Sequence, residues 1–254
     1  MPARSDSSAT LVIESVKTER HLLTILGTRP LICARMSQKA RNELLLPAGR
    51  KTAADKQSSL KHNPVEEFQA SPYLLSDSSE PTLIALMSSA FKGAMMTAAV
   101  DLPGTKRAQI GRLVFVENDY VPVYGEPQLF MSVTRSADIN RTPDIRTRAI
   151  IPEWACQISV SFVSPMLNLQ GIVNLLSAGG VTAGVGDWRP EKGKGTYGQF
   201  EVVNATDPRF TRIQATWGRA AQEKAIANPE PYDSESAEML NWFGVEARKR
   251  GKLV

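Results

Sequence analysis

The sequence predicts an α+β protein with a ferredoxin-like, or RNA-recognition-type, core, and three observations lead to this prediction. Strand-like and helical segments follow one another as β, α, β, β, α, β once the polar segments between them are set aside, and this is the order of that fold. The composition, 42% hydrophobic and 22% charged, is that of a globular protein. A chain of 254 residues can build one substantial core with insertions.

The first half of the chain supplies a strand, an insertion, a second strand and a helix. Few large apolar residues occur in the segment 47–72, which is therefore predicted to be an insertion or loop. Ser88 and Ser89 are candidate caps for the helix that follows them, because a serine hydroxyl can accept a hydrogen bond from a free N–H of the first turn. In chain order the segments are strands at 11–16, 21–26 and 30–33, a helix at 37–46, the polar segment at 47–72, a strand at 82–86 and a helix at 91–100.

The second half contains the longest strand-like run, 147–162, whose end alternates apolar and polar residues. Asn168 is a candidate cap for the next helix, and Gly179-Gly180 is predicted to end it. In chain order the segments are strands at 112–117 and 128–133, a polar loop at 134–144, the strand at 147–162, a helix at 168–177, a glycine-rich loop at 179–198, a strand at 200–203, and helices at 212–227 and 234–249.

These segments predict three parts. Residues 1–19 form an N-terminal tail or strand, and residues 20–206 form the core, with a basic insertion after the first strand at about 35–80. Residues 207–254 form a C-terminal helical tail.

Positive charge is concentrated in one early segment. The net charge is only +4, but residues 29–61 contain eight basic residues against two acidic ones. Such a concentration is typical of contact with a nucleic-acid backbone, and it also occurs on faces that merely keep a protein soluble.

Several classes are disfavoured by what the sequence lacks. No stretch has the roughly 18 apolar residues of a membrane helix, and the polar start of the chain is unlike a signal peptide. Cys33 and Cys156 are predicted to be reduced thiols, which favours a cytoplasmic protein. The only two histidines, His21 and His62, are not in a metal-ligand spacing, so no metal, cofactor or catalytic group is predicted.

The glycine-rich loop is the most unusual segment. It lacks the Gly-Lys-Ser/Thr ending of a phosphate-binding P-loop, and it precedes a strand instead of joining a strand to a helix. Its cations and its two aromatic residues suit a single strand of nucleic acid, because a base can stack on an aromatic ring. The alternative is a long connection with its tryptophan in the core. The residues concerned are Trp188, Arg189, Lys192, Lys194 and Tyr197.

Two segments resemble the RAMP superfamily, the repeat-associated proteins that form the backbone subunits of CRISPR effector complexes. Ser88-Ser89-Ala90-Phe91-Lys92-Gly93-Ala94-Met95 is similar to that superfamily's Ser-Ser-Leu-Lys-Gly-Ala-Leu segment. The stretch from Gly179 to Val202 is similar to its C-terminal glycine-rich loop and closing strand.

Residues 20–203 also resemble an uncharacterised set of phage and prophage proteins. The shared features are a Gly-Thr-x-Pro-Leu start at Gly27, a Phe-Lys-x-Ala helix, and a Gly-Val-Gly-x-Trp-Arg-Pro-Glu signature at Gly184 to Glu191. The resemblance implies binding of single-stranded nucleic acid along a groove and head-to-tail assembly into a helical filament, in the cytoplasm of a bacterial host cell. It implies no cleavage, because the catalytic aspartate of the target-cleaving subunits has no counterpart that can be placed here.

The function predicted from the sequence is a non-catalytic subunit that binds RNA or single-stranded DNA. Its further partners would be copies of itself and other subunits of an effector or phage complex. The alternatives are a phage-related scaffold subunit that binds no nucleic acid, and a metal-dependent nuclease using Asp138 and Asp144. The candidate nucleic-acid contacts are Arg35, Lys39, Arg41, Arg50, Lys51, Lys92, Arg135, Arg141, Trp188, Arg189, Lys192, Lys194 and Tyr197.

Overall fold

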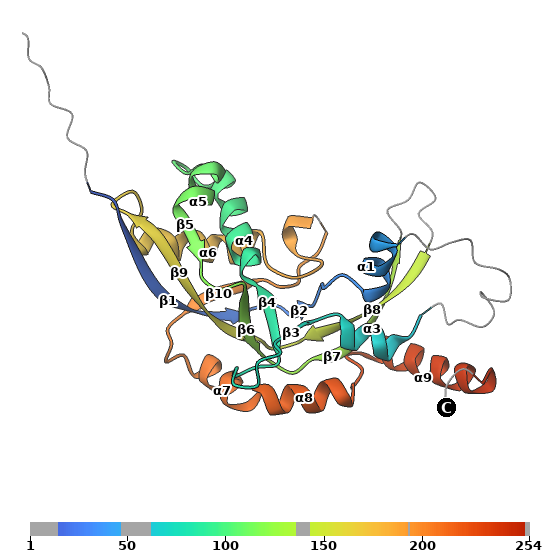
Figure 1. The fold of residues 1–254 in the computed structure, drawn as a ribbon. Helices are drawn as coiled ribbons and strands as arrows, with labels where there is room; N and C mark the ends of the chain where they lie inside the picture. The colour runs from blue at the N-terminus through green and yellow to red at the C-terminus, as the bar shows by residue number, and fades with distance from the viewer. Residues whose placement is uncertain (1–14, 47–61, 136–142, 193, 252–254) are drawn as a thin grey trace, which may run out of the picture.

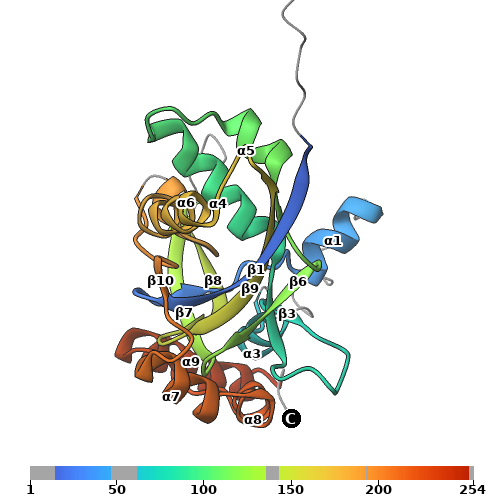
Figure 2. The same cartoon turned by 90° about the vertical axis from the view of Figure 1, so that its left-hand side faces the viewer.

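The fold was analysed in a computed structural model of the chain, which describes residues 15–46, 62–135, 143–192 and 194–251. It is an α+β protein with two antiparallel sheets, one of seven strands and one of three (Figure 1). Helices lie on both sides of the larger sheet (Figure 2). No helix in the described ranges is long and apolar enough to cross a membrane.

The larger sheet is built around β1 (Lys17–Gly27) and β9 (Ala155–Ser164). Its strand order is β10-β1-β9-β6-β4-β3, with β5 also paired to β9, and every pair is antiparallel. The alternation predicted for β9 is confirmed, because Cys156, Ile158, Val160 and Phe162 all lie in the core and are at most 1% exposed. The other strands are β3 (Tyr73–Leu74), β4 (Ile84–Met87), β5 (Val114–Val116), β6 (Tyr120–Tyr124) and β10 (Phe200–Val203).

One face of this sheet is covered by α4 (Ser88–Asp101) and α6 (Leu169–Thr182), with α5 (Arg107–Leu113) beside α4. Asn168 caps α6 as predicted, accepting a hydrogen bond from the Gly171 N–H at 2.8 Å. Ser88 and Ser89 do not cap α4, because the helix already begins at Ser88 and its N-cap is Met87.

The prediction that Gly179-Gly180 ends α6 is wrong, since the helix continues to Thr182. These glycines instead allow close packing. A Cβ at Gly179 would lie 2.9 Å from the Ala94 carbonyl oxygen, and one at Gly180 would lie 2.1 Å from that of Phe200. The backbones of α4 and β10 therefore occupy the space that side chains at these two positions would need.

The run 147–162, predicted as one strand, is two strands in different sheets. β8 (Pro143–Ile151) pairs with β2 (Leu31–Ile32) and β7 (Gln128–Arg135) in the smaller sheet, whereas β9 belongs to the larger one. Trp154, fully buried, lies between them, and its indole N–H donates to the Arg29 carbonyl at 2.9 Å. This contact with a distant segment fixes the point where the chain changes sheets.

The smaller sheet is covered on one face by α3 (Pro64–Ala70) and flanked by α9 (Ser234–Lys249) along β7. The segment 47–72 was predicted as a loop, and α3 lies at its end. A further helix, α1 (Gln38–Leu45), follows β2. Cys33 and Cys156 are buried and form no disulfide, and burial raises the pKa of the Cys33 thiol to about 12.

The segment beyond Asp207 packs on the sheet itself. The helix predicted at 212–227 is two helices, α7 (Pro208–Thr216) and α8 (Arg219–Ala227), on the face opposite α4 and α6 (Figure 2). Phe210 and Ile213 of α7 form a second cluster with Leu26 and Ala155 of the sheet.

Candidate nucleic-acid interface

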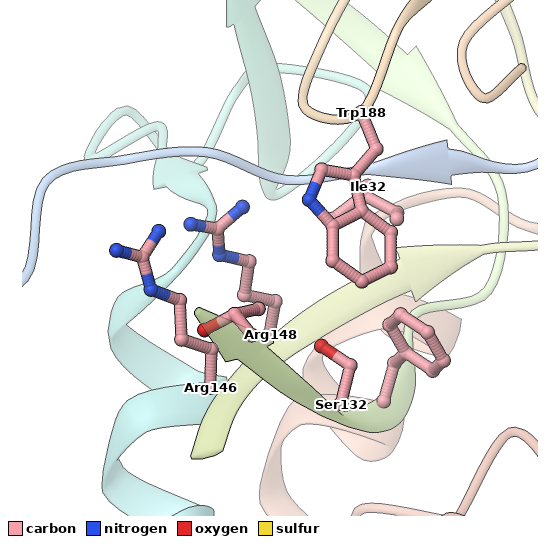
Figure 3. Close-up of a pocket in the computed structure, with 7 residues that line it drawn as sticks. Ile32, Ser132, Arg146, Arg148 and Trp188 are labelled. Carbon is pink, nitrogen blue, oxygen red and sulfur yellow. The ribbon is translucent and has the colours of Figure 1, made fainter. Parts of the chain in front are cut away.

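The smaller sheet carries arginines and hydroxyls on the face opposite the core. Cross-strand pairing in β7 and β8 sets Phe130 opposite Arg148 and Ser132 opposite Arg146, and in an antiparallel pair opposed residues share a face. These side chains line a small hollow in the surface (Figure 3). The residues around it are Ile32, Phe130, Ser132, Thr134, Arg146, Arg148 and Trp188.

An aromatic cluster adjoins the hollow. The ring centroid of Phe130 lies 6.1 Å from that of Trp188, 6.4 Å from that of Tyr197 and 5.7 Å from that of Tyr232. Trp188 and Tyr197 are 6.1 Å apart and neither is fully buried. Aromatic residues that are held together yet remain accessible can accept a planar ligand by stacking.

The two arginines differ in their surroundings. Arg148 forms an ion pair with Asp187, and burial, together with the nearby charge of Arg146, lowers the pKa of its guanidinium to about 10. Arg148 therefore remains charged at neutral pH. Arg146 is exposed, and Figure 3 shows both side chains extending from β8 in the same direction, next to Trp188. An incoming anion would meet Arg146 first.

The glycine-rich loop is tied to β2 and its surroundings by backbone hydrogen bonds. The Asp187 N–H donates to the Ile32 carbonyl at 3.0 Å and the Gly198 N–H to the Pro30 carbonyl at 2.8 Å. A Cβ at Gly198 would lie 1.8 Å from the Val185 carbonyl oxygen. Glycine at this position thus allows backbone segments to approach one another.

Trp188 has a left-handed backbone conformation, with φ of 50°. A non-glycine residue with positive φ is uncommon and persists only where the surrounding structure holds it. Here the Trp188 carbonyl accepts a hydrogen bond from the Tyr197 N–H at 3.2 Å. The loop therefore fixes where the indole points.

The loop cations have different roles. Arg189 donates to the Glu191 carboxylate at 2.6 and 2.9 Å and to the Gly186 carbonyl at 2.8 Å, so it braces the loop. Glu191 lies in the short 3-10 helix η1 (Pro190–Lys192). Its carboxylate also accepts a hydrogen bond from the Thr97 hydroxyl of α4 at 2.8 Å. Lys192 and Lys194 are exposed.

The structure brings only some of the sequence-predicted residues together. Trp188 and Tyr197 meet in the aromatic cluster, and Arg135 is exposed at the end of β7. Lys92 instead lies over the Phe115 ring on the larger sheet, 4.8 Å from its centroid, and the Arg35 guanidinium carbon is 5.8 Å from the Tyr73 ring centroid. Lys39 and Arg41 lie on α1, whereas Arg50, Lys51 and Arg141 fall outside the described residues.

Sequence reasoning missed Arg146, Arg148, Phe130 and Tyr232. The alternation Asp144-x-Arg146-x-Arg148 on a strand was a signal for the arginines, because residues two apart on a strand share a face. Phe130 and Tyr232 gave no local signal, since they join Trp188 only through the tertiary fold.

Of the two carboxylates in the nuclease alternative, the structure describes only Asp144. Asp138 lies outside the described residues, and the Asp144 carboxylate is 3.0 Å from His62 Nε2. His62 Nδ1 is also 2.8 Å from Glu67. Within the described ranges no group of three His, Cys, Asp or Glu side chains could hold a metal ion.

Comparison with known proteins found similarity to solved structures only. No family model and no curated protein matches the chain. Among solved structures, the crystal structure of Cmr6 from Pyrococcus furiosus is similar at 8% sequence identity and a TM-score of 0.37. The match covers 74% of this chain and 98% of that one.

Proposed function

We propose that this protein is a non-catalytic subunit that binds RNA or single-stranded DNA and assembles head-to-tail with other copies of itself in a larger complex. The single observation that supports binding is the aromatic cluster around Trp188 beside Arg146 and Arg148. Bases stack on exposed aromatic rings, and arginines neutralise phosphates. One surface of the smaller sheet offers both.

A single strand suits this surface better than a duplex. Stacking on Trp188 or Tyr197 requires a base whose face is free, and in a duplex the faces are occupied by neighbouring bases. Arg146 and Arg148, two residues apart on β8, lie on the face that carries Trp188, so a nucleic-acid backbone could run along β8 while a base reaches the cluster.

The fold proposed for the core is ferredoxin-like, of the type found in the RAMP superfamily. The order β10-β1-β9-β5, antiparallel throughout, supports it, as do the helices α4 and α6 that precede β5 and β10 on one face. In this reading β1, β5, β9 and β10 are the four strands of the βαββαβ unit.

The test is binding of a fluorescently labelled single strand, followed by anisotropy. Trp188→Ala should weaken binding by about 1–3 kcal/mol, as expected for the loss of one stacked base, and Trp188→Phe should restore part of it. Arg146→Ala should reduce the slope of log affinity against log salt by about one. Lys224→Ala, at an exposed position on α8, is the matched control.

The outcomes separate this proposal from its rival. If the wild-type protein binds no single-stranded nucleic acid, the binding proposal is rejected in favour of the scaffold subunit. The rival is favoured by exposed apolar residues such as Trp242 on α9, which is 64% exposed and suits contact with another protein. Binding unaffected by either substitution would place the interface elsewhere on the molecule.

A further inference from the structure

The outer face of the larger sheet, opposite α4 and α6, carries two exposed apolar side chains on either side of β9. Leu22 of β1 is 63% exposed and Phe115 of β5 is 45% exposed. The register sets Leu22 opposite Ser159 and Phe115 opposite Ser161, so the small serines of β9 lie between the two apolar side chains. Leu22 and Phe115, with the Arg20–Glu117 ion pair across them, are called here the strand platform.

The platform is the part of this face that the C-terminal helices leave uncovered. Farther along the same strands, α7 covers Leu26 and Ala155 with Phe210 and Ile213. Alternation along β1 places Leu22 on the same face as Leu26. Leu22 and Phe115 remain exposed on one face, on either side of β9, and exposed apolar residues gathered on one face can mark a contact with another molecule.

A second exposed apolar surface lies on α9. Trp242 is 64% exposed and Val245 is 38% exposed, and residues three or four apart share one face of a helix. Glu238, one turn before Trp242, lies on that face and forms no ion pair with any residue in the described part of the chain. The other side of α9 is occupied, because Met239 and Leu240 pack against the core. Glu238, Trp242 and Val245 are called here the α9 ridge.

We propose that the α9 ridge of one copy binds the strand platform of the next copy. The chemistry of the two surfaces is complementary. Trp242 and Val245 would cover Leu22 and Phe115, while the Glu238 carboxylate would approach the Lys92 ammonium, which lies over Phe115 beside the Arg20–Glu117 ion pair. An aromatic side chain at the centre with polar or charged residues at the rim is typical of a protein interface.

The positions of the two surfaces determine the type of assembly. Platform and ridge lie toward opposite ends of the molecule, as the positions of β1 with β5 and of α9 in Figure 1 show. A contact between two different surfaces is heterologous, and it extends from copy to copy unless a rotation closes it into a ring. This inference rests on the head-to-tail assembly in the proposed function, for which it names the two contacting surfaces.

The experiment is a complementation of two interface variants, followed by size-exclusion chromatography with light scattering and without nucleic acid. Trp242→Glu places a charge on the α9 ridge, and Phe115→Glu places a charge on the strand platform, so each variant has one of its two contact surfaces disrupted. Each variant alone should be monomeric, with self-association weakened tenfold or more, the loss expected for a central interface aromatic. Their equimolar mixture should form dimers and nothing larger, because only one ridge and one platform remain intact.

The controls guard against unfolding and against general charge effects. Val181 of α6 is 61% exposed, and Val181→Glu introduces the same charge at a comparable apolar position, so it should assemble as the wild type does. Leu22→Glu should reproduce the effect of Phe115→Glu. Circular dichroism and thermal unfolding of each variant show that loss of assembly is not loss of folding.

Three results would overturn the inference: a monomeric wild type at high concentration, a single variant that still assembles, or a mixture of folded variants that stays monomeric. A single variant that still assembles would point to an isologous or differently placed contact. Binding of a single-stranded nucleic acid, measured on the same variants, keeps the two proposals separate. Wild-type protein that assembles through these surfaces without binding a strand would refute only the nucleic-acid part of the proposed function.

Discussion

At the scale of single residues, the candidate interface depends on backbone positions that few residue types tolerate. Trp188 is held at positive φ, and its carbonyl faces Gly195 so closely that a Cβ there would lie 1.5 Å from the oxygen. The backbone position of Trp188 therefore depends on glycine at position 195. The indole has its orientation because a residue seven positions later has no side chain.

Gly195→Ala is expected to displace the loop and turn Trp188 away from Phe130. The clash should destabilise the fold by about 1–3 kcal/mol, the usual cost of forcing extra atoms into a packed site. The substitution should also weaken binding of single-stranded nucleic acid. Thermal unfolding and anisotropy would measure the two effects.

The matched control for this substitution is Gly93→Ala in α4, where a Cβ would meet nothing within 4 Å. There the change should stabilise the protein by about 0.5–1 kcal/mol, because alanine favours a helix over glycine. Equal effects of the two substitutions would contradict the role assigned to Gly195.

At the scale of elements, the glycine-rich loop is joined to α4 through one carboxylate. Burial raises the pKa of Glu191, but hydrogen bonds from Thr97 and Arg189 and the nearby positive charges outweigh burial, and the pKa lies below its usual 4.5. The charged form is thus favoured by folding. Its stabilising effect is complete above pH 4.5 and is lost as the pH falls through the lower pKa of the folded state.

We therefore expect Glu191→Gln to destabilise the protein above pH 4.5 and to make little difference in stronger acid. Urea unfolding of both proteins across this range would show the gap in stability closing as the pH falls. A gap that stays constant with pH would mean that the carboxylate charge has no part in holding the loop. Thr97→Val, which removes one donor and keeps the charge, should produce a smaller gap.

At the scale of the whole molecule, the C-terminal helices are part of the same folded body as the sheet. Gln222 of α8 is fully buried between strands. Its amide oxygen accepts from the N–H groups of Leu83 and Ile84 at 2.8 and 2.9 Å, and its amide nitrogen donates to the carbonyls of Val123 and Gly125 at 2.7 and 2.9 Å. One side chain thus supplies partners for four backbone groups at the start of β4 and the end of β6.

Gln222→Leu keeps the approximate volume and removes all four hydrogen bonds. Buried backbone groups left without partners are costly, so the free energy of unfolding should fall by at least about 3 kcal/mol. The comparison is Gln214→Leu, since Gln214 is half-buried and makes one contact of 3.3 Å with the Tyr124 hydroxyl. A loss at Gln222 no larger than that at Gln214 would show that α8 is held by other contacts.

The local pattern of the chain predicted elements well wherever periodicity or a cap decided the outcome. Strand β10 and helix α9 are confirmed, as are the alternation along β9 and the Asn168 cap. The same reasoning joined β8 to β9 and ended α6 at its glycines. Both errors arose where a contact from elsewhere in the chain, Trp154 with Arg29 or Gly180 with Phe200, overrode the local signal.

The sequence by itself determined the α+β class, most of the elements and the loop that carries Trp188 and Tyr197, because these depend on neighbours along the chain. Only the tertiary structure decided that Phe130 and Tyr232 join them, that Arg146 and Arg148 lie alongside, and that Lys92 lies on the other sheet. Pairing between strands sets which distant residues share a face, and a shift of one residue in register would turn each side chain to the opposite face. A site built from four separate segments is therefore specified by the packing of the whole molecule.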